Sequence, residues 1–167
     1  MKIYTGIGSR KTPKNILEVM IKIGEYMANK GCILRSGGAD GADTAFEIGC
    51  DRANGRKEIY LPWTNFNKRK GIVASINAFY VAELIASRYH PAWSRCSEGA
   101  RRLHSRNVFQ ILGSELDAPT DAVFCWTPNG SGSGGTGQAI RMAKSLDIRI
   151  YDMGNPEVLS LITSWFK

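Results

Sequence analysis

Short runs of apolar residues alternate along the chain with stretches in which apolar residues recur every three or four positions. The short runs are typical of buried strands, and the longer spacing is typical of amphipathic helices. We predict strands at Lys2–Ile7, Cys32–Leu34, Glu58–Leu61, Asp121–Trp126 and Ile148–Tyr151. We predict helices at Ile16–Met27, Ala39–Asp51, Ile72–Ser87, Ser97–Leu112, Gly135–Leu146 and Pro156–Phe166.

The alternation of strands and helices predicts an α/β fold, in which a mainly parallel sheet is covered on both faces. We therefore expect a Rossmann-like three-layer sandwich with a helical insertion from Ile72 to Leu112, where Pro91 separates the two helices. A chain of 167 residues with 43% hydrophobic residues can bury one good core. We predict a single domain, 1–167.

Three glycine-rich loops each follow a predicted strand, namely 6–10, 36–43 and 129–137. Glycine lets backbone N–H groups turn toward a bound anion, and a helix start adds its positive dipole. Ligands of such folds lie beyond the carboxyl ends of the strands. The loops therefore predict a nucleotide-type ligand at one rim. The predicted ligand-binding residues of these loops are Gly8, Ser9, Arg10, Ser36, Gly37, Gly38, Ala39, Asp40, Gly41, Asp43, Gly134, Gly135, Thr136 and Gln138.

Several of these positions have a second interpretation. Asp40 and Asp43 either cap the helix that follows them or accept hydrogen bonds from ribose hydroxyls. Arg10 is either a phosphate ligand or an ordinary surface charge, and the loop at 129–137 is either a ligand loop or a mobile linker. Trp126 and Trp63 each follow a predicted strand, and each either stacks on a base or packs in the core. Trp126 is the better candidate for stacking.

The basic charge of the chain has two interpretations, an anionic partner or an ordinary soluble surface. Its net charge is +7, and its isoelectric point is near 9.4. One basic cluster is Lys68-Arg69-Lys70, and a second comprises Arg88, Arg95, Arg101, Arg102 and Arg106. The second cluster, with aromatic residues beside it, makes binding of single-stranded DNA an alternative function.

The cysteines and histidines give no reason to expect a metal. Cys32, Cys50, Cys96 and Cys125 form no C-x-x-C pair, so we predict buried free thiols and no metal site. His90 and His104 have no metal or catalytic-triad spacing, and we interpret both as structural or surface residues. The chain has no secretory leader and no apolar run of roughly 18–20 residues, so we expect a cytoplasmic protein that does not bind membranes.

Four motifs in order resemble the SLOG superfamily, and within it the Rossmann-like domain of DNA-processing protein A and its short phage and bacterial relatives. They are G-S-R after the first strand, S-G-G-A-D-G-A-D after the second, R-N before an apolar helix, and D-A-V-x-x-W before a Gly/Ser loop. The resemblance implies that Gly8, Ser9 and Arg10 bind a phosphate-bearing group. It also implies a second cradle at Ser36, Gly37, Gly38 and Gly41, and places Arg106 and Asn107 near the binding rim. DNA-processing proteins that load recombinase usually have flanking domains, for which this chain has no room.

The chain more distantly resembles the Lonely Guy phosphoribohydrolases, which carry P-G-G-x-G-T-x-x-E at the third loop. The corresponding stretch here, 134–141, lacks the glutamate, so an enzyme of this kind would need Glu47 as its carboxylate. The alternative for Glu47 is a solvated helix residue. The superfamily also implies a homo-oligomer, for which the insertion at 72–112 could supply the interface.

Three functions follow, in the order in which we rank them. The first is a sensor or sequestering protein that binds a nucleotide or nucleotide-derived ligand and requires no other cofactor. The second is a single-stranded DNA-binding protein, and the third is a nucleoside monophosphate phosphoribohydrolase.

Overall fold

A computed structural model describes residues 1–166 and has a five-stranded sheet at its centre. The strands are β1 (Ile3–Gly6), β2 (Ile33–Ser36), β3 (Lys57–Ile59), β4 (Ala122–Cys125) and β5 (Arg149–Asp152). Their order is β3-β2-β1-β4-β5, and every neighbouring pair is parallel. In this register Tyr4 of β1 is paired with Leu34 on one side and with Ala122 on the other. The predicted Rossmann-like α/β fold is confirmed.

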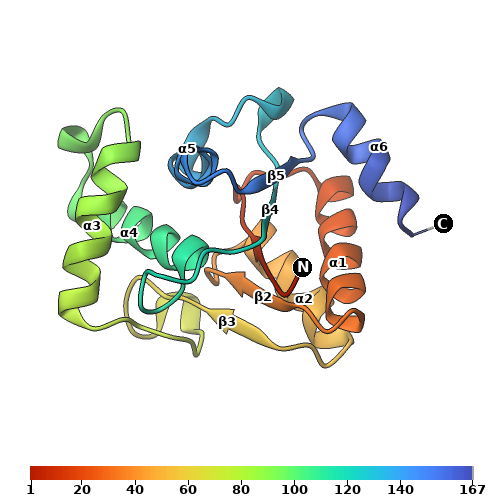
Figure 1. Cartoon of the computed structure of the whole chain (residues 1–167), viewed down its shortest axis with the longest axis horizontal. Coiled ribbons are helices and arrows are strands. Elements are labelled where there is room, and N and C mark those ends of the chain that lie inside the picture. The colour runs from red at the N-terminus through yellow and green to blue at the C-terminus, as the bar shows by residue number, and fades with distance from the viewer. Residues whose placement is uncertain (167) are drawn as a thin grey trace.

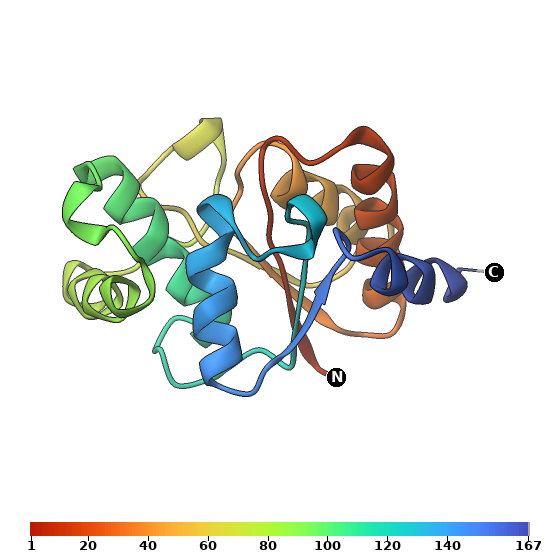
Figure 2. The same ribbon diagram turned by 90° about the horizontal axis from the view of Figure 1, so that it is seen from above.

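Helices cover both faces of the sheet (Figure 1). One face packs against α1 (Lys14–Asn29), α2 (Ala42–Arg52) and α6 (Pro156–Ser164). The other face packs against α4 (Glu98–Leu112) and α5 (Gly137–Ser145), while α3 (Ile76–Tyr89) packs mainly on those two helices. Helices α3 and α6 therefore lie at opposite ends of the molecule (Figures 1 and 2).

The central strand β4 shows why this sequence forms a buried parallel sheet. All four of its residues are completely buried. Ala122 and Phe124 point into the core beneath α1 and α2, and Val123 and Cys125 point into the core beneath α4 and α5. Because side chains alternate across a strand, a continuous apolar run is needed where both faces are covered.

Some helices begin later than the apolar spacing predicts. Helix α2 begins at Ala42, not at Ala39, because Gly38 and Gly41 have φ values of +65° and +85° and form a turn. Helix α3 begins at Ile76, not at Ile72, because the Ser75 hydroxyl caps it by accepting the Ala78 N–H at 3.2 Å. The residues before Ser75 extend instead along β3, where Ile72 bridges Tyr60.

All four cysteines are free thiols. Three are buried as expected, but Cys96 is only partly buried. None of the helices within residues 1–166 is both long and apolar enough to cross a membrane.

Candidate functional site

A cavity of about 590 Å³ opens at the carboxyl ends of the strands. The chain passes from β1 outward to β3 and then crosses back to β4, so the order reverses at β1, where parallel sheets bind ligands. The cavity walls come from the loops after β1, β2, β3 and β4 and from one face of α4. In Figure 2 these loops lie at the edge of the sheet away from the N-terminus. Residues of all three glycine-rich loops thus border one cavity at this edge of the sheet.

Half of the residues predicted for the site line this cavity. They are Gly8, Ser9, Arg10, Ala39, Asp43, Arg106, Asn107, Gly135 and Thr136. The other half do not line the cavity. They are Ser36, Gly37, Gly38, Asp40, Gly41, Glu47, Trp126, Gly134 and Gln138.

The glycines of the first two loops pack the loops together. A Cβ on Gly41 would lie 2.8 Å from the Arg10 Cα, and a Cβ on Gly8 would lie 2.7 Å from the Ala42 Cβ. Both separations are too short for real side chains. These glycines therefore fix the backbone that carries Ser9 and Arg10 to the cavity.

A buried ion pair lies against the backbone of the second glycine-rich loop, 36–43. The Arg106 guanidinium lies 3.3 Å from the Asp43 carboxylate, and both residues are almost fully buried. Arg106 also donates to the Gly37 carbonyl, and the Ala39 N–H donates to Asp43 at 3.3 Å. The Asp43 carboxylate thus takes the place that we expected a phosphate to take in this loop.

The electrostatics of this pair follow from its burial. Burial raises the pKa of Asp43, while Arg106 and the backbone N–H groups of Ala39, Gly8 and Gly37 oppose the rise. Burial likewise lowers the pKa of Arg106, and Asp43 opposes that fall. One carboxylate oxygen of Asp43, Oδ1, has no hydrogen-bond partner in residues 1–166. Asp43 lines the cavity, although this oxygen itself is buried from solvent.

The mouth of the cavity is cationic. Arg10 and its neighbour Lys11 are exposed, line the cavity and form no ion pair within residues 1–166. On the opposite loop, a Cβ on Gly135 would meet nothing within 4 Å. Helix α5 begins just after this loop with neither a side-chain cap nor an acidic residue in its first turn. The positive end of the helix dipole and the two cations favour an anion here.

An aromatic wall faces the cavity from the loop after β3. Trp63 is 39% exposed, and its ring meets that of Phe66 edge to face at 5.2 Å. The Arg106 guanidinium lies 5.9 Å from the Phe66 ring centre. Trp63 can therefore stack on a planar ligand, whereas Trp126 packs against the core beside α1 and lies outside the cavity lining.

Glu47 is held away from the cavity. Its carboxylate forms ion pairs with Arg69 and, at 3.7 Å, with Lys57. Glu47 is therefore an ion-paired residue, and not the solvated helix residue that we gave as the alternative. Among residues 1–166, the cavity-lining carboxylate is that of Asp43, which is engaged with Arg106.

Two other predicted residues outside the cavity, Ser36 and Gln138, form hydrogen bonds inside the fold. The Ser36 hydroxyl donates to the Gly6 carbonyl at 2.7 Å. Gln138 is fully buried and accepts from the Asn107 amide at 3.4 Å. Asp40 is exposed.

Helix α4 contributes cavity residues that the sequence analysis missed, namely Ala100, Leu103 and His104. The sequence does contain a signal for them. Positions 100, 103, 104 and 107 lie on one face of a predicted helix, and Asn107 was already a predicted site residue. Burial and the nearby His90 lower the pKa of His104 to about 4, so its imidazole is neutral at pH 7.

The second basic cluster is not a continuous basic surface. Arg101 lies 5.6 Å from the Trp93 ring, and Arg102 lies 4.6 Å from the Phe79 ring and donates to the Pro62 carbonyl. Arg106 is buried, which leaves Arg88 and Arg95 exposed. Most of the cluster is used inside the fold.

Neither a family model nor a curated protein sequence matches the chain. Three solved structures are similar to it. The molybdenum cofactor carrier protein of Chlamydomonas reinhardtii is 18% identical, with a TM-score of 0.59 over 98% of this chain and 84% of that one. This likeness shows that the two proteins share a fold.

The other two structures are DNA processing protein A of Helicobacter pylori and of Streptococcus pneumoniae. The first is 13% identical, with a TM-score of 0.44 over 99% of this chain and 80% of that one. The second is 15% identical, with a TM-score of 0.44 over 95% of this chain and 60% of that one.

Proposed function

We propose that the cavity binds one nucleotide or nucleotide-derived molecule and that the protein acts as a sensor or a sequestering protein. The observation that carries the proposal is the arrangement of three different surfaces around one hollow. Trp63 offers a stacking face, Asp43 offers a carboxylate in the cavity lining, and Arg10 with Lys11 offers positive charge that has no ion-pair partner among residues 1–166. A base, a ribose and a phosphate need these three kinds of contact.

The phosphate would lie between the first and third loops. The second loop is filled by Asp43, whereas Arg10 and Lys11 have no ion-pair partner in residues 1–166 and α5 has no acidic residue in its first turn. The phosphate would therefore approach Ser9 and Arg10 on one side and Gly135 and Thr136 on the other. The absence of a Cβ on Gly135 leaves open space for it.

Binding is favoured over hydrolysis by the position of the carboxylates. A general base must come within hydrogen-bond reach of the reacting group. Glu47 is bound to Arg69 and Lys57 outside the cavity, and Asp43 is paired with Arg106. Single-stranded DNA is the second candidate, because the exposed Arg88 and Arg95 remain on the surface.

A thermal-shift screen of the purified protein tests the proposal. The ligands are nucleoside mono-, di- and triphosphates and a short single-stranded oligonucleotide, applied to the parent, Arg10→Ala and Lys14→Ala. Lys14 is the matched control, because it is an exposed cation that does not line the cavity. A ligand at about a hundred times its Kd stabilises a protein by roughly 2.7 kcal/mol.

We expect a small nucleotide to stabilise the parent and Lys14→Ala alike. Arg10→Ala should bind it about 10- to 150-fold more weakly, since a hydrogen bond to a charged group contributes about 1.5–3 kcal/mol. Stabilisation by the oligonucleotide alone, with a steep dependence on salt, would instead establish the DNA-binding function.

A further inference from the structure

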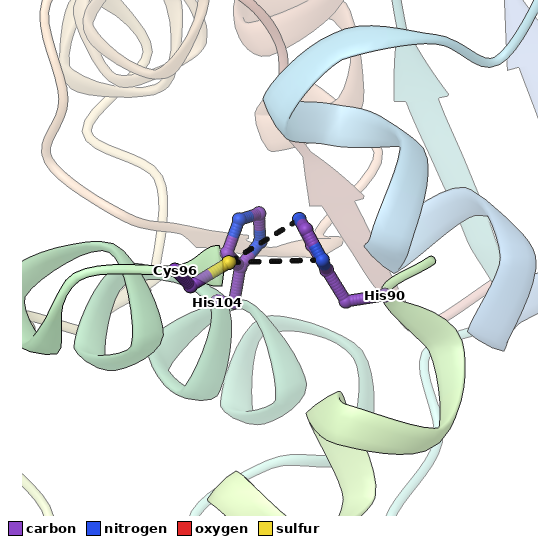
Figure 3. Close-up of side chains that lie close together, drawn as sticks. All are labelled: His90, Cys96 and His104. Carbon is purple, nitrogen blue, oxygen red and sulfur yellow. Dashed lines mark hydrogen bonds between the residues drawn. The ribbon is translucent and has the colours of Figure 1, made fainter. Parts of the chain in front are cut away.

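Two histidines and one cysteine meet beside the cavity although they are scattered in the sequence. His90 ends α3, Cys96 follows a short turn at Trp93–Arg95, and His104 lies in the second turn of α4. Figure 3 shows the three side chains converging from these segments. The turn that Pro91 introduces between α3 and α4 brings His90 and Cys96 back over the helix that carries His104.

The separations suit a tetrahedral metal ion. All three residues offer a ligand atom within 4.8 Å of the others, and the Cys96 Sγ lies 3.7 Å from each ring nitrogen of His90. The His90 and His104 ring centres are 4.4 Å apart. Zinc bonds of about 2.3 Å to sulfur and about 2.05 Å to nitrogen, at a tetrahedral angle, require a sulfur-to-nitrogen separation of roughly 3.6 Å.

The donors are poorly satisfied by the protein itself. The Nδ1 atom of His104 is buried and has no hydrogen-bond partner in residues 1–166. The Cys96 thiol makes one contact with a backbone carbonyl, that of Ala92, at 3.6 Å. Buried polar atoms of this kind are normally paired, so His104 Nδ1 requires an explanation. A bound cation would supply one.

A metal ion here would replace one hydrogen bond and would meet little uncompensated positive charge. His90 Nδ1 accepts the Ala92 N–H at 3.2 Å, and a metal bond through this nitrogen would replace that contact. Arg106 and Arg141 carry positive charge near His104, but Arg106 is paired with Asp43. A Cys96 thiolate would bring one negative charge to the ion. Thiolate and imidazole are the ligands that zinc prefers in proteins.

We propose that His90, Cys96 and His104 bind a divalent cation of the zinc class through one sulfur and two nitrogen atoms. Three protein ligands leave a fourth tetrahedral position open, as in zinc sites that bind water or a substrate. His104 also lines the cavity, so the ion would lie at the cavity wall with its open position toward the ligand. We expect a phosphate oxygen of the nucleotide as the fourth ligand, and this expectation rests on the proposed function. The site formed by the three residues does not depend on it.

Cobalt(II) titration of the reduced, metal-free protein tests the site, because tetrahedral cobalt bound to thiolate has a characteristic absorption spectrum. We expect the parent to bind one cobalt ion with a thiolate-to-cobalt charge-transfer band that zinc abolishes by displacement. Cys96→Ser should lose the band, and His104→Gln should bind cobalt at least tenfold more weakly. Cys32→Ser is the matched control, because Cys32 lies in the opposite core, and it should behave as the parent does.

Two results would overturn the metal site. One is a folded parent, verified by circular dichroism, that shows no charge-transfer band at equimolar cobalt. The other is a band that persists in Cys96→Ser. The titration contains no nucleotide, so a failure of nucleotide binding leaves its outcome unchanged. Repeating it with a nucleoside monophosphate then tests the fourth position, where a spectral change is expected only if the phosphate reaches the ion.

Discussion

The side chain of Asp43 decides what the second glycine loop can bind. An aspartate early in a helix is usually a cap or a partner of the helix dipole. In this fold it is instead an ion-pair partner of Arg106, which lies 63 positions further along the chain. The same carboxylate has one buried oxygen, Oδ1, that has no hydrogen-bond partner in residues 1–166, and the ribose contact stays a prediction.

Loss of the Asp43 carboxylate should destabilise the protein strongly. Asp43→Ala leaves the buried Arg106 charge without its partner, and breaking a buried pair in this way costs about 3–5 kcal/mol. The free energy of unfolding in urea measures the effect. Asp40→Ala is the control, since an exposed substitution is expected to stay within about 0.5 kcal/mol. Equal effects of the two substitutions would show that the pair adds nothing.

Asp121 predicts a dependence of stability on pH. Its carboxylate accepts the N–H groups of Lys2 at 2.6 Å and Ile3 at 2.9 Å, and these bonds lower its pKa below the ordinary value of 3.8. A depressed pKa stabilises the fold above pH 3.8, and this contribution disappears as the pH falls through the folded-state pKa. Asp121→Asn should therefore be less stable than the parent at neutral pH, with a difference that shrinks in acid. Thermal melts from pH 7 to about pH 2 measure it, because the contribution is lost below pH 3.8, and a difference independent of pH over this range would contradict the explanation.

At the scale of elements, the order of strands and helices followed from local spacing alone. Continuous apolar runs identified the strands, because both faces of a parallel sheet are buried. The starts of helices were less predictable where a turn or a cap competes with the apolar pattern. Gly41 and Ser75 each move a start by about one turn, and the reason lies in backbone conformation and a hydroxyl contact.

Gly41 is the glycine of these loops whose replacement should be most harmful. Its φ is +85°, and a Cβ would lie 2.8 Å from the Arg10 backbone. Gly41→Ala should lose more than the roughly 1–2 kcal/mol of the backbone penalty and should also displace Arg10 from the cavity mouth. Gly99→Ala in the first turn of α4 is the matched control, because its Cβ meets nothing within 4 Å.

We expect that control to be neutral or stabilising by about 0.5–1 kcal/mol, since alanine is favoured within helices. Urea unfolding of both variants compares them directly. An unchanged stability of Gly41→Ala would show that the two loops do not pack as described.

At the scale of the whole molecule, the sequence was enough to predict that the glycine-rich loops lie at one edge of the sheet, but not which side chains pair with one another around them. The pairs Glu47 with Arg69, Asp43 with Arg106 and His90 with Cys96 depend on how helices pack, which spacing does not encode. Trp63 and Trp126 both follow strands, yet one faces the cavity and the other the core. Only the three-dimensional arrangement distinguishes them.

The expected homo-oligomer stays a prediction, and α3 offers a surface for it. Ile76, Tyr80 and Leu84 recur every four residues on this helix and are 88%, 65% and 50% exposed. Replacing Ile76 and Leu84 with lysine should reduce the mass measured by light scattering to that of one chain. Leu161→Lys, on α6 at the other end of the molecule, is the control and should leave the mass unchanged. A parent that is monomeric at all concentrations would contradict the prediction.

A calorimetric titration of a nucleoside monophosphate into the parent and into Trp63→Ala tests whether the cavity is a nucleotide site. We expect one molecule bound per chain and an affinity about 5- to 150-fold lower in the variant, because stacking contributes roughly 1–3 kcal/mol per base. Trp126→Phe, a change at the tryptophan outside the cavity, should bind as the parent does. No heat of binding in the parent, or equal affinity in Trp63→Ala, would contradict a nucleotide site in this cavity.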